Sequence, residues 1–152
     1  EVYGLPKILK ANGYQTAFFH GAFNGSQNFD QYCKVAGFDN YFGKNEYVGP
    51  EAFDGRWGIF DEEFMQYFSG KMTEFKQPFF STIFTISSHN PYIIPEKYKG
   101  KFPKGTTKIH ESIAYADNAL KRFFETASKE DWYKNTLFVI TSDHTSSEPT
   151  EK

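Results

Sequence analysis

The sequence predicts an α/β fold with a mainly parallel sheet flanked by helices. Helical and strand-like segments alternate along the chain, and the strand-like segments are nearly continuous apolar runs, as in strands covered on both faces. A histidine or an aspartate also follows each of the three apolar runs closely. Ligands bind beyond the carboxyl ends of strands in open parallel sheets, so these three places are the first candidates for a functional site.

The first half of the chain is expected to place two helices around one strand. Residues 5–13 are typical of a short helix, with a proline in the first turn and a glycine at the end. Residues 15–20 follow as a strand. Residues 29–35 suit one or two helical turns, before a long connection rich in Gly, Asn and Tyr over residues 38–58.

The second half is expected to alternate two helices with two strands. Aromatic residues and methionine at helical spacing predict an amphipathic helix over about residues 61–75. A β-rich run at 79–86 predicts a strand, a long amphipathic helix follows over about 109–128, and a strand is expected at 137–141. Three strands are few for such a sheet. We therefore expect a fragment truncated at both ends, with a sheet edge that is uncovered or used for self-association.

Composition sets limits on the partners. The chain has 152 residues, 39% hydrophobic and 24% charged, which is sufficient for one core. The formal net charge of -2 argues against nucleic acid, because binding to a phosphate backbone needs a concentrated basic face. No apolar run reaches about eighteen residues, so this segment is not expected to span a membrane. The single cysteine, Cys33, allows no internal disulfide.

Aromatic residues are unusually frequent. Phe, Tyr and Trp together make up 20% of the sequence. The excess fits a core built from rings, and it also fits an aromatic-lined sugar site. Both interpretations remain open from composition alone.

Asp143 and His144 directly follow the last predicted strand. A carboxylate and an imidazole are good ligands for a divalent metal, and adjacent residues that leave a strand can turn toward one ion. The alternative is an aspartate that caps a turn beside a surface histidine. The dipeptide by itself does not decide between them.

His89 stands in the polar loop after the second predicted strand. Pro91 restricts Asn90 to extended geometry, so the loop can hold the imidazole in a fixed direction. As a hydrogen-bond donor or general acid, such a histidine can engage a phosphate or sulfate oxygen. A histidine bonded within its own loop is the alternative. His20, at the end of the first strand, is more typical of a structural residue, and His110 of a solvated one.

Eight short segments of the sequence form a recognisable series. They are residues 5–10, 13–16, 19–21, 57–61, 78–80, 85–92, 115–117 and 139–144. In order and spacing they resemble the lipoteichoic acid synthase-like phosphoglycerol transferases, which belong to the sulfatase and alkaline phosphatase superfamily. The resemblance extends over nearly the whole chain.

This resemblance implies that residues 1–152 are a fragment of one sulfatase-like catalytic domain with an alkaline phosphatase/sulfatase-like fold. The implied activity is that of a metal-dependent phosphoglycerol transferase, or of a sulfatase-like hydrolase, acting on phosphate or sulfate esters of the cell envelope. Asp143 and His144 match the metal-ligand pair of the family, for which manganese is the usual ion and zinc, magnesium or calcium the alternatives. His89 matches the histidine that contacts the substrate head group. We expect these three residues on one rim of the sheet.

Further expectations concern the parts of the enzyme outside this sequence. The nucleophile is expected upstream of residue 1, so this fragment alone should be inactive. The substrate is expected to be an anionic ester on a lipid head group or a glycan. The implied location is the extracytoplasmic face of the cell membrane or the periplasm, in a parent protein anchored in the membrane.

One stretch departs from the family pattern. After the His-Gly pair the family places an Asp, then a Trp and an Arg that grip glycerol phosphate, whereas residues 22–29 carry no charge here. Arg56 and Trp57 are candidates for a replacement cation and ring. A non-catalytic module of the same fold, binding an envelope glycan through its aromatic surface, is the alternative function. A Thr, Ser or Cys after an apolar strand upstream of residue 1 would favour the enzyme.

Overall fold

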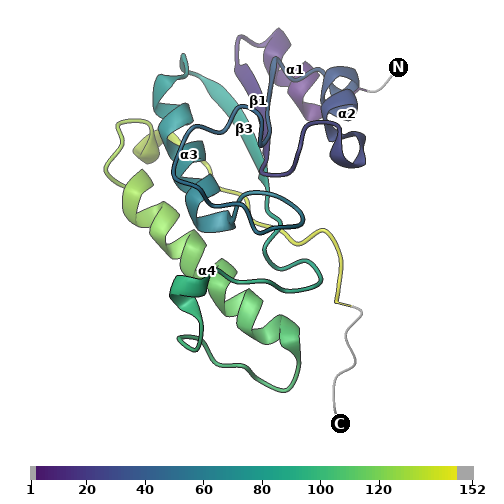
Figure 1. Cartoon of the computed structure of the whole chain (residues 1–152). Helices are drawn as coiled ribbons and strands as arrows, with labels where there is room; N and C mark the ends of the chain where they lie inside the picture. The colour runs from purple at the N-terminus through teal and green to yellow at the C-terminus, as the bar shows by residue number, and fades with distance from the viewer. Residues whose placement is uncertain (1–2, 147–152) are drawn as a thin grey trace.

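A computed structural model describes residues 3–146 of the chain (Figure 1). The described residues contain a three-stranded parallel sheet in the order β2-β1-β3. The central strand β1 (Gln15–His20) pairs with β2 (Asn40–Phe42) on one side and with β3 (Phe79–Phe84) on the other. The predicted class, an α/β fold with a parallel sheet flanked by helices, is confirmed.

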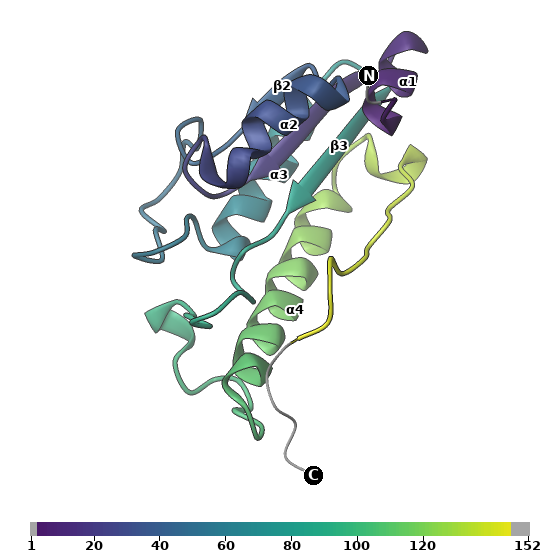
Figure 2. The ribbon, with the colours of Figure 1, turned by 90° about the vertical axis from the view of Figure 1, so that its right-hand side faces the viewer.

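Four α-helices of the described residues cover the two faces of the sheet. Helices α1 (Leu5–Ala11) and α2 (Phe29–Ala36) lie on one side, and α3 (Asp61–Glu74) and α4 (Lys108–Ala127) on the other (Figures 1 and 2). Between residues 3 and 146, three short 3₁₀ helices occupy connections, at Ser26–Asn28, Glu96–Tyr98 and Tyr133–Asn135. All four α-helices lie close to the predicted segments.

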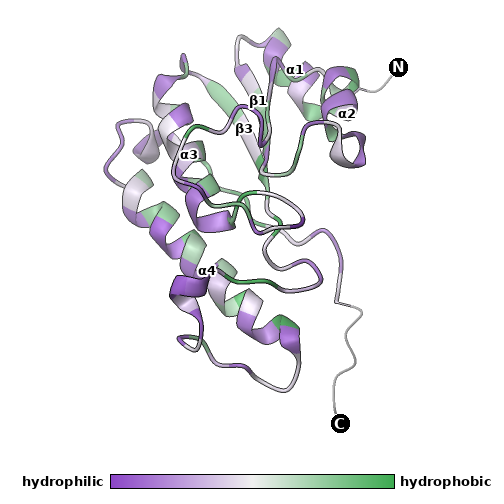
Figure 3. Cartoon of the chain, in the orientation of Figure 1, coloured by the Kyte–Doolittle hydropathy of each residue, from purple (hydrophilic) through white to green (hydrophobic). Residues whose placement is uncertain are grey.

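The core is built largely from aromatic rings. Phe19 is fully buried and stacks on Phe42, with ring centroids 4.6 Å apart, while Phe68 of α3 meets it edge-on at 4.8 Å. On the opposite face of the same strand, Phe18 packs against Phe29 and Phe38. In Figure 3 hydrophobic colour follows the strands, whereas hydrophilic residues alternate with it on the helices. Neighbouring positions of β1 therefore face two apolar layers, which explains its continuous apolar sequence.

One predicted strand is absent from the described structure. Residues 137–141 are extended but pair with no strand there. Leu137, Val139 and Ile140 are 88%, 80% and 67% exposed. Phe138 instead packs against Phe124 of α4, with ring centroids 5.1 Å apart. The prediction of a strand ending near Asp143 is therefore wrong for this structure, because an apolar run becomes a strand only where its backbone finds a partner.

The third strand lies where none was predicted. The short strand β2 falls inside the segment that the sequence assigned to a long connection. Its three residues are too few to show an alternating pattern. The strand predicted to end near Ser87 also stops earlier, at Phe84, so residues 85–87 already belong to the loop beyond the sheet.

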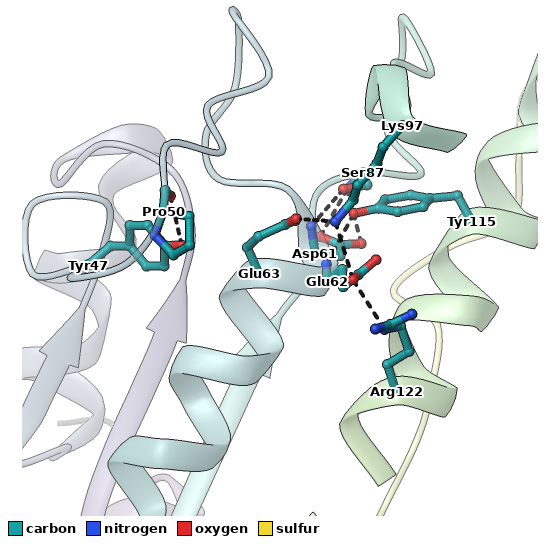
Figure 4. A network of polar contacts seen from close by, with 9 residues as sticks. All are labelled: Tyr47, Pro50, Asp61, Glu62, Glu63, Ser87, Lys97, Tyr115 and Arg122. Atoms are coloured by element: carbon teal, nitrogen blue, oxygen red, sulfur yellow. Dashed lines mark hydrogen bonds and ion pairs between the residues drawn. The ribbon is translucent and has the colours of Figure 1, made fainter. Parts of the chain in front are cut away.

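Asp61, the first residue of α3, is hydrogen-bonded to the segment that follows β3 (Figure 4). Its buried carboxylate accepts hydrogen bonds from the backbone N–H of Ile86 at 2.9 Å and of Ser87 at 3.2 Å. The N–H of Asp61 donates in return to the Ser87 hydroxyl at 3.0 Å. Burial raises the pKa of Asp61 to about 6, against the lowering effect of these hydrogen bonds.

Glu62 ties the same helix to two other parts of the chain. Its carboxylate is 3.3 Å from the Lys97 ammonium and 3.2 Å from Nε of Arg122 on α4 (Figure 4). Lys97 also contacts Glu63 at 2.6 Å. Because a buried carboxylate without cations would be strongly destabilising, these contacts fix how the segment around Lys97 and helix α4 sit on α3.

The segment just before α3 closes on the end of β1. Gly58 pairs with Ala22 in an isolated antiparallel bridge, and the N–H of Ile59 donates to the Gly21 carbonyl at 2.9 Å. A Cβ added at Gly58 would lie 2.2 Å from that same carbonyl oxygen. The two backbones therefore approach so closely that only glycine fits at position 58.

We predict that Gly58→Ala destabilises the protein by about 1–3 kcal/mol, because the new methyl group forces the two backbones apart. Urea unfolding of this chain measures the effect. Gly70→Ala is the matched control, since Gly70 lies in α3 with nothing within 4 Å of its added Cβ. That variant should be neutral or slightly stabilised. Equal stability of the two variants would contradict the close approach.

Asp61 should make the stability of the chain depend on pH. Its folded pKa of about 6 lies above its ordinary value of 3.8, so the folded state binds the proton more tightly than the unfolded state. The stability due to protonated Asp61 is therefore complete below pH 4 and is lost as the pH rises through 6. Asp61→Asn removes this titration. The unfolding free energy of the unmodified protein, relative to the variant, should fall by about 3 kcal/mol over that range.

Urea unfolding at several pH values between 4 and 7 provides the measurement. The matched control is the same substitution at an exposed aspartate, Asp131→Asn, measured at the same pH values. A constant difference for Asp61→Asn over the same range would refute the raised pKa.

Candidate functional site

The carboxyl ends of β1 and β3 open onto a small cavity of about 40 Å³. Chain segments distant in sequence meet there: the ends of both strands, the 3₁₀ turn before α2, the segment before α3 and the loop after β3. Six of the lining side chains carry polar atoms, and these are His20, Ser26, Gln27, Trp57, Thr85 and His89. The cavity thus lies at the edge of the sheet where the sequence placed the candidate site.

His20 is held firmly in the wall of this cavity. It is 3% exposed and packs edge-on against Phe29, with ring centroids 4.8 Å apart. Its Nδ1 lies 3.0 Å from the carbonyl oxygen of Phe84, its partner in the register of β1 and β3. A carbonyl only accepts, so Nδ1 carries the proton. Burial lowers the pKa of His20, against the raising effect of this hydrogen bond, which favours the neutral imidazole.

His89 lines the same cavity from the loop after β3 and is exposed. Its Nδ1 lies 2.9 Å from the carbonyl oxygen of Asn90. The indole N–H of Trp57 donates to that same oxygen at 2.7 Å, and the Trp57 and His89 rings meet edge-on with centroids 4.7 Å apart. His89 therefore has a contact within its own loop and also lines the cavity. That it engages a phosphate or sulfate oxygen stays a prediction.

Asp143 and His144 lie apart from the lining of this cavity and contact each other. The backbone N–H of His144 donates to the Asp143 carboxylate at 2.9 Å, and Nε2 of His144 lies 3.4 Å from its other oxygen. Both side chains are exposed. The two views agree that this part of the chain runs beyond the same end of the sheet as the loop after β3 (Figures 1 and 2). That His89, Asp143 and His144 together engage a metal and an anion stays a prediction.

The donor chemistry of the Asp143–His144 pair suits a divalent metal, but the pair is only part of a ligand set. Metal sites in enzymes usually draw about three or four ligands from protein and substrate. Within residues 3–146, no group of three or more His, Cys, Asp or Glu side chains is arranged to hold an ion. Further ligands would therefore be needed to complete a metal site.

Ser26 and Gln27 were not identified as candidates from the sequence. They belong to the turn that carries the chain from β1 into α2, where Gln27 and Asn28 both adopt left-handed backbone angles, with φ of 51° and 59°. Such angles are uncommon for residues other than glycine and cost about 1 kcal/mol or more each. The Asn24-Gly25 dipeptide signals a turn here, but nothing local indicates that the turn faces a cavity.

Comparison with known proteins identifies the family. The sulfatase family model matches residues 1–149. Lipoteichoic acid synthase 1 of Bacillus subtilis (strain 168) is 30% identical over 147 residues, which cover 92% of this chain and 23% of that protein. The lipoteichoic acid synthase-like protein YvgJ of the same strain is 29% identical over 149 residues, covering 95% and 24%. The chain therefore spans about a quarter of the length of these curated relatives.

Solved structures agree with this assignment. A protein of the alkaline phosphatase superfamily from Vibrio parahaemolyticus superposes with a TM-score of 0.75 and 29% identity, over 84% of this chain and 32% of that chain. The lipoteichoic acid synthase LtaP from Listeria monocytogenes gives 0.70 and 22%, over 84% and 33%, and supports the fold alone. Because the family model extends over nearly the whole sequence and the fold agrees with it, this chain belongs to the sulfatase family, in the alkaline phosphatase superfamily.

Proposed function

We propose that this chain forms the substrate-facing part of a metal-dependent phosphoglycerol transferase, or of a sulfatase-like hydrolase, acting on phosphate or sulfate esters of the cell envelope. The main observation is that His20, at the end of β1, and His89, in the loop after β3, both line one cavity at the carboxyl edge of the sheet. The sulfatase family and the lipoteichoic acid synthases among the relatives support this class of chemistry. The proposed substrate is an anionic ester on a lipid head group or a glycan.

The two histidines have different roles in this proposal. His20 is buried and favours the neutral form, with Nδ1 used in a hydrogen bond to the sheet, so it shapes the cavity wall without adding a positive charge. His89 is exposed at the mouth of the cavity and has its Nδ1 at the Asn90 carbonyl, which leaves Nε2 for the substrate. When the imidazole carries a second proton on Nε2, it donates a hydrogen bond or that proton to an oxygen of the anionic group, while Nδ1–H stays on the Asn90 carbonyl.

Arg56 and Trp57 provide a cation and a ring close to this cavity. Trp57 lines it, and the Arg56 guanidinium lies 5.5 Å from the centre of the Trp57 ring. We propose that this pair takes the place of the charged residues missing from residues 22–29. The exposed guanidinium attracts the anion, while the ring excludes water from one side of it.

Asp143 and His144 are proposed as two ligands of a divalent ion, with manganese expected. The bound ion supplies positive charge to the transferring group and lowers the pKa of the nucleophile. The nucleophile and the remaining ligands are proposed to belong to the rest of the enzyme, upstream of residue 1 for the nucleophile. Asp143 contributes the negative charge of the pair, and its carboxylate also fixes the adjacent backbone through the N–H of His144.

The proposed location is the extracytoplasmic face of the cell membrane or the periplasm, in a parent protein anchored in the membrane. Within residues 3–146, no helix has both the length and the apolar character that a membrane span requires.

In the complete enzyme, Asp143→Asn should lower metal content and reduce turnover roughly 10²-fold or more, because it keeps the volume of the side chain but removes the charge that holds the cation. Elemental analysis gives metal content, thermal unfolding checks the fold, and turnover is measured on a panel of phosphodiester and sulfate ester substrates. Asp131→Asn, at an exposed aspartate outside the pair, should change neither quantity. Full metal occupancy and turnover in Asp143→Asn would refute the assignment.

His89→Ala in the complete enzyme should instead affect the handling of substrate. We expect turnover to fall by about 10²-fold, in the range for loss of a positioned acid–base group, while metal content stays near normal. His110→Ala is the matched control, since His110 is exposed and does not line the cavity. Unchanged kcat and KM in His89→Ala would show that the cavity is not the substrate site.

A further inference from the structure

Trp57 contacts the loop of His89 in two ways. Its indole Nε1–H donates to the carbonyl oxygen of Asn90 at 2.7 Å, and its ring meets the His89 ring edge-on, with centroids 4.7 Å apart and planes 69° from parallel. Nδ1 of His89 reaches the same Asn90 oxygen at 2.9 Å. One carbonyl group therefore serves both rings.

This shared acceptor selects one form of His89. A backbone carbonyl has two lone pairs and no proton to give, so both nitrogens that reach it do so as N–H donors. In the neutral imidazole the proton then sits on Nδ1, and Nε2 keeps its lone pair. The edge-on ring contact limits rotation of the imidazole about its bond to the backbone. An exposed loop histidine without such contacts would sample both tautomers and several directions.

Trp57 is itself well anchored. One carboxylate oxygen of Asp54 accepts the backbone N–H groups of Arg56, Trp57 and Gly58, at 2.8, 2.7 and 3.0 Å. Gly58 in turn lies against the backbone of Gly21, at the end of β1. The indole is thus fixed to the end of one strand, while His89 follows the end of another.

We propose that Trp57 is a positioning residue for His89. The anchored indole holds the Asn90 carbonyl and the edge of the imidazole, so that Nδ1 is protonated in both the neutral and the charged ring. Nε2 is thereby directed to the substrate, and it donates to the anionic group when it takes up the second proton. This inference rests on the function proposed above for His89. If Trp57 only covered the loop, the contact between its ring and His89 would be sufficient. The hydrogen bond from its N–H to the Asn90 carbonyl would then have no purpose.

The decisive variant is Trp57→Phe, which keeps an aromatic ring and removes only the N–H donor and one ring of the indole. Trp132→Phe is the matched control, because the Trp132 N–H donates to Thr73 at 3.1 Å and its ring is buried in the core, away from the cavity lining. Any general effect of replacing a tryptophan, including loss of stability, should appear in both variants.

The first measurement uses this chain and records ¹⁵N chemical shifts of the histidine rings by long-range NMR correlation, at a pH where His89 is neutral. The unmodified protein should show a protonated Nδ1 and an unprotonated Nε2 for His89. In Trp57→Phe the two shifts should move toward each other, as the tautomer ratio falls by roughly two- to tenfold. Trp132→Phe should leave them unchanged. Unmoved His89 shifts in Trp57→Phe, or a protonated Nε2 in the unmodified protein, would overturn the proposal.

The second measurement is a double-mutant cycle on turnover of the complete enzyme. Trp57→Phe should lower kcat roughly 10- to 100-fold with KM little changed, as expected for a misplaced reacting group. In the His89→Ala background it should cause no further loss, because its effect passes through His89. An equal loss in both backgrounds would overturn the proposal. If His89→Ala itself leaves turnover intact, the proposed function fails, while the NMR measurement still decides whether Trp57 positions His89.

Discussion

The central strand β1 has no face left for solvent, because Phe18 packs toward α2 and Phe19 toward α3. This double burial requires a helical layer on each side of the sheet, so a ligand can approach only at the edge where the strands end. The register of β1 with β3 then places His20 opposite Phe84, whose carbonyl fixes the histidine ring. The cavity is therefore a consequence of how the core is packed.

Buried charge at the start of α3 connects this core to the loops around the cavity. Asp61 holds the chain just beyond β3, and Glu62 holds both the segment around Lys97 and helix α4. Replacing these carboxylates by apolar groups of the same shape would avoid their desolvation, but it would also release the segments that they fix. These carboxylates therefore fix the positions of the loops. In particular, the loop that carries His89 begins at backbone N–H groups that donate to Asp61.

Local sequence patterns predicted most of the fold and part of the site. The helices and the strands β1 and β3 have clear periodicity or apolar runs. The strand β2 has only three residues, and it forms because their backbone pairs with β1, beginning at Ala17 opposite Asn40. Residues 137–141 have a strand-like sequence, but pairing is a contact between distant segments that such a pattern does not encode. In the candidate site, His89 was predicted from its place after a strand, and it lines the cavity. The positions of Gln27 and Trp57 in the cavity lining depend on a left-handed turn and on a close approach of two backbones, which only the folded chain reveals.

The outer edge of β3 carries no strand in the described structure, and exposed Leu137, Val139 and Ile140 belong to the chain segment that follows α4. Unpaired backbone together with exposed apolar side chains is the combination from which intermolecular β-pairing starts. These three side chains, together with the unpaired edge, are therefore a place from which copies of this chain can associate in concentrated solution. A soluble preparation for spectroscopy is best obtained by placing charged residues at these three positions, all of which are absent from the lining of the cavity.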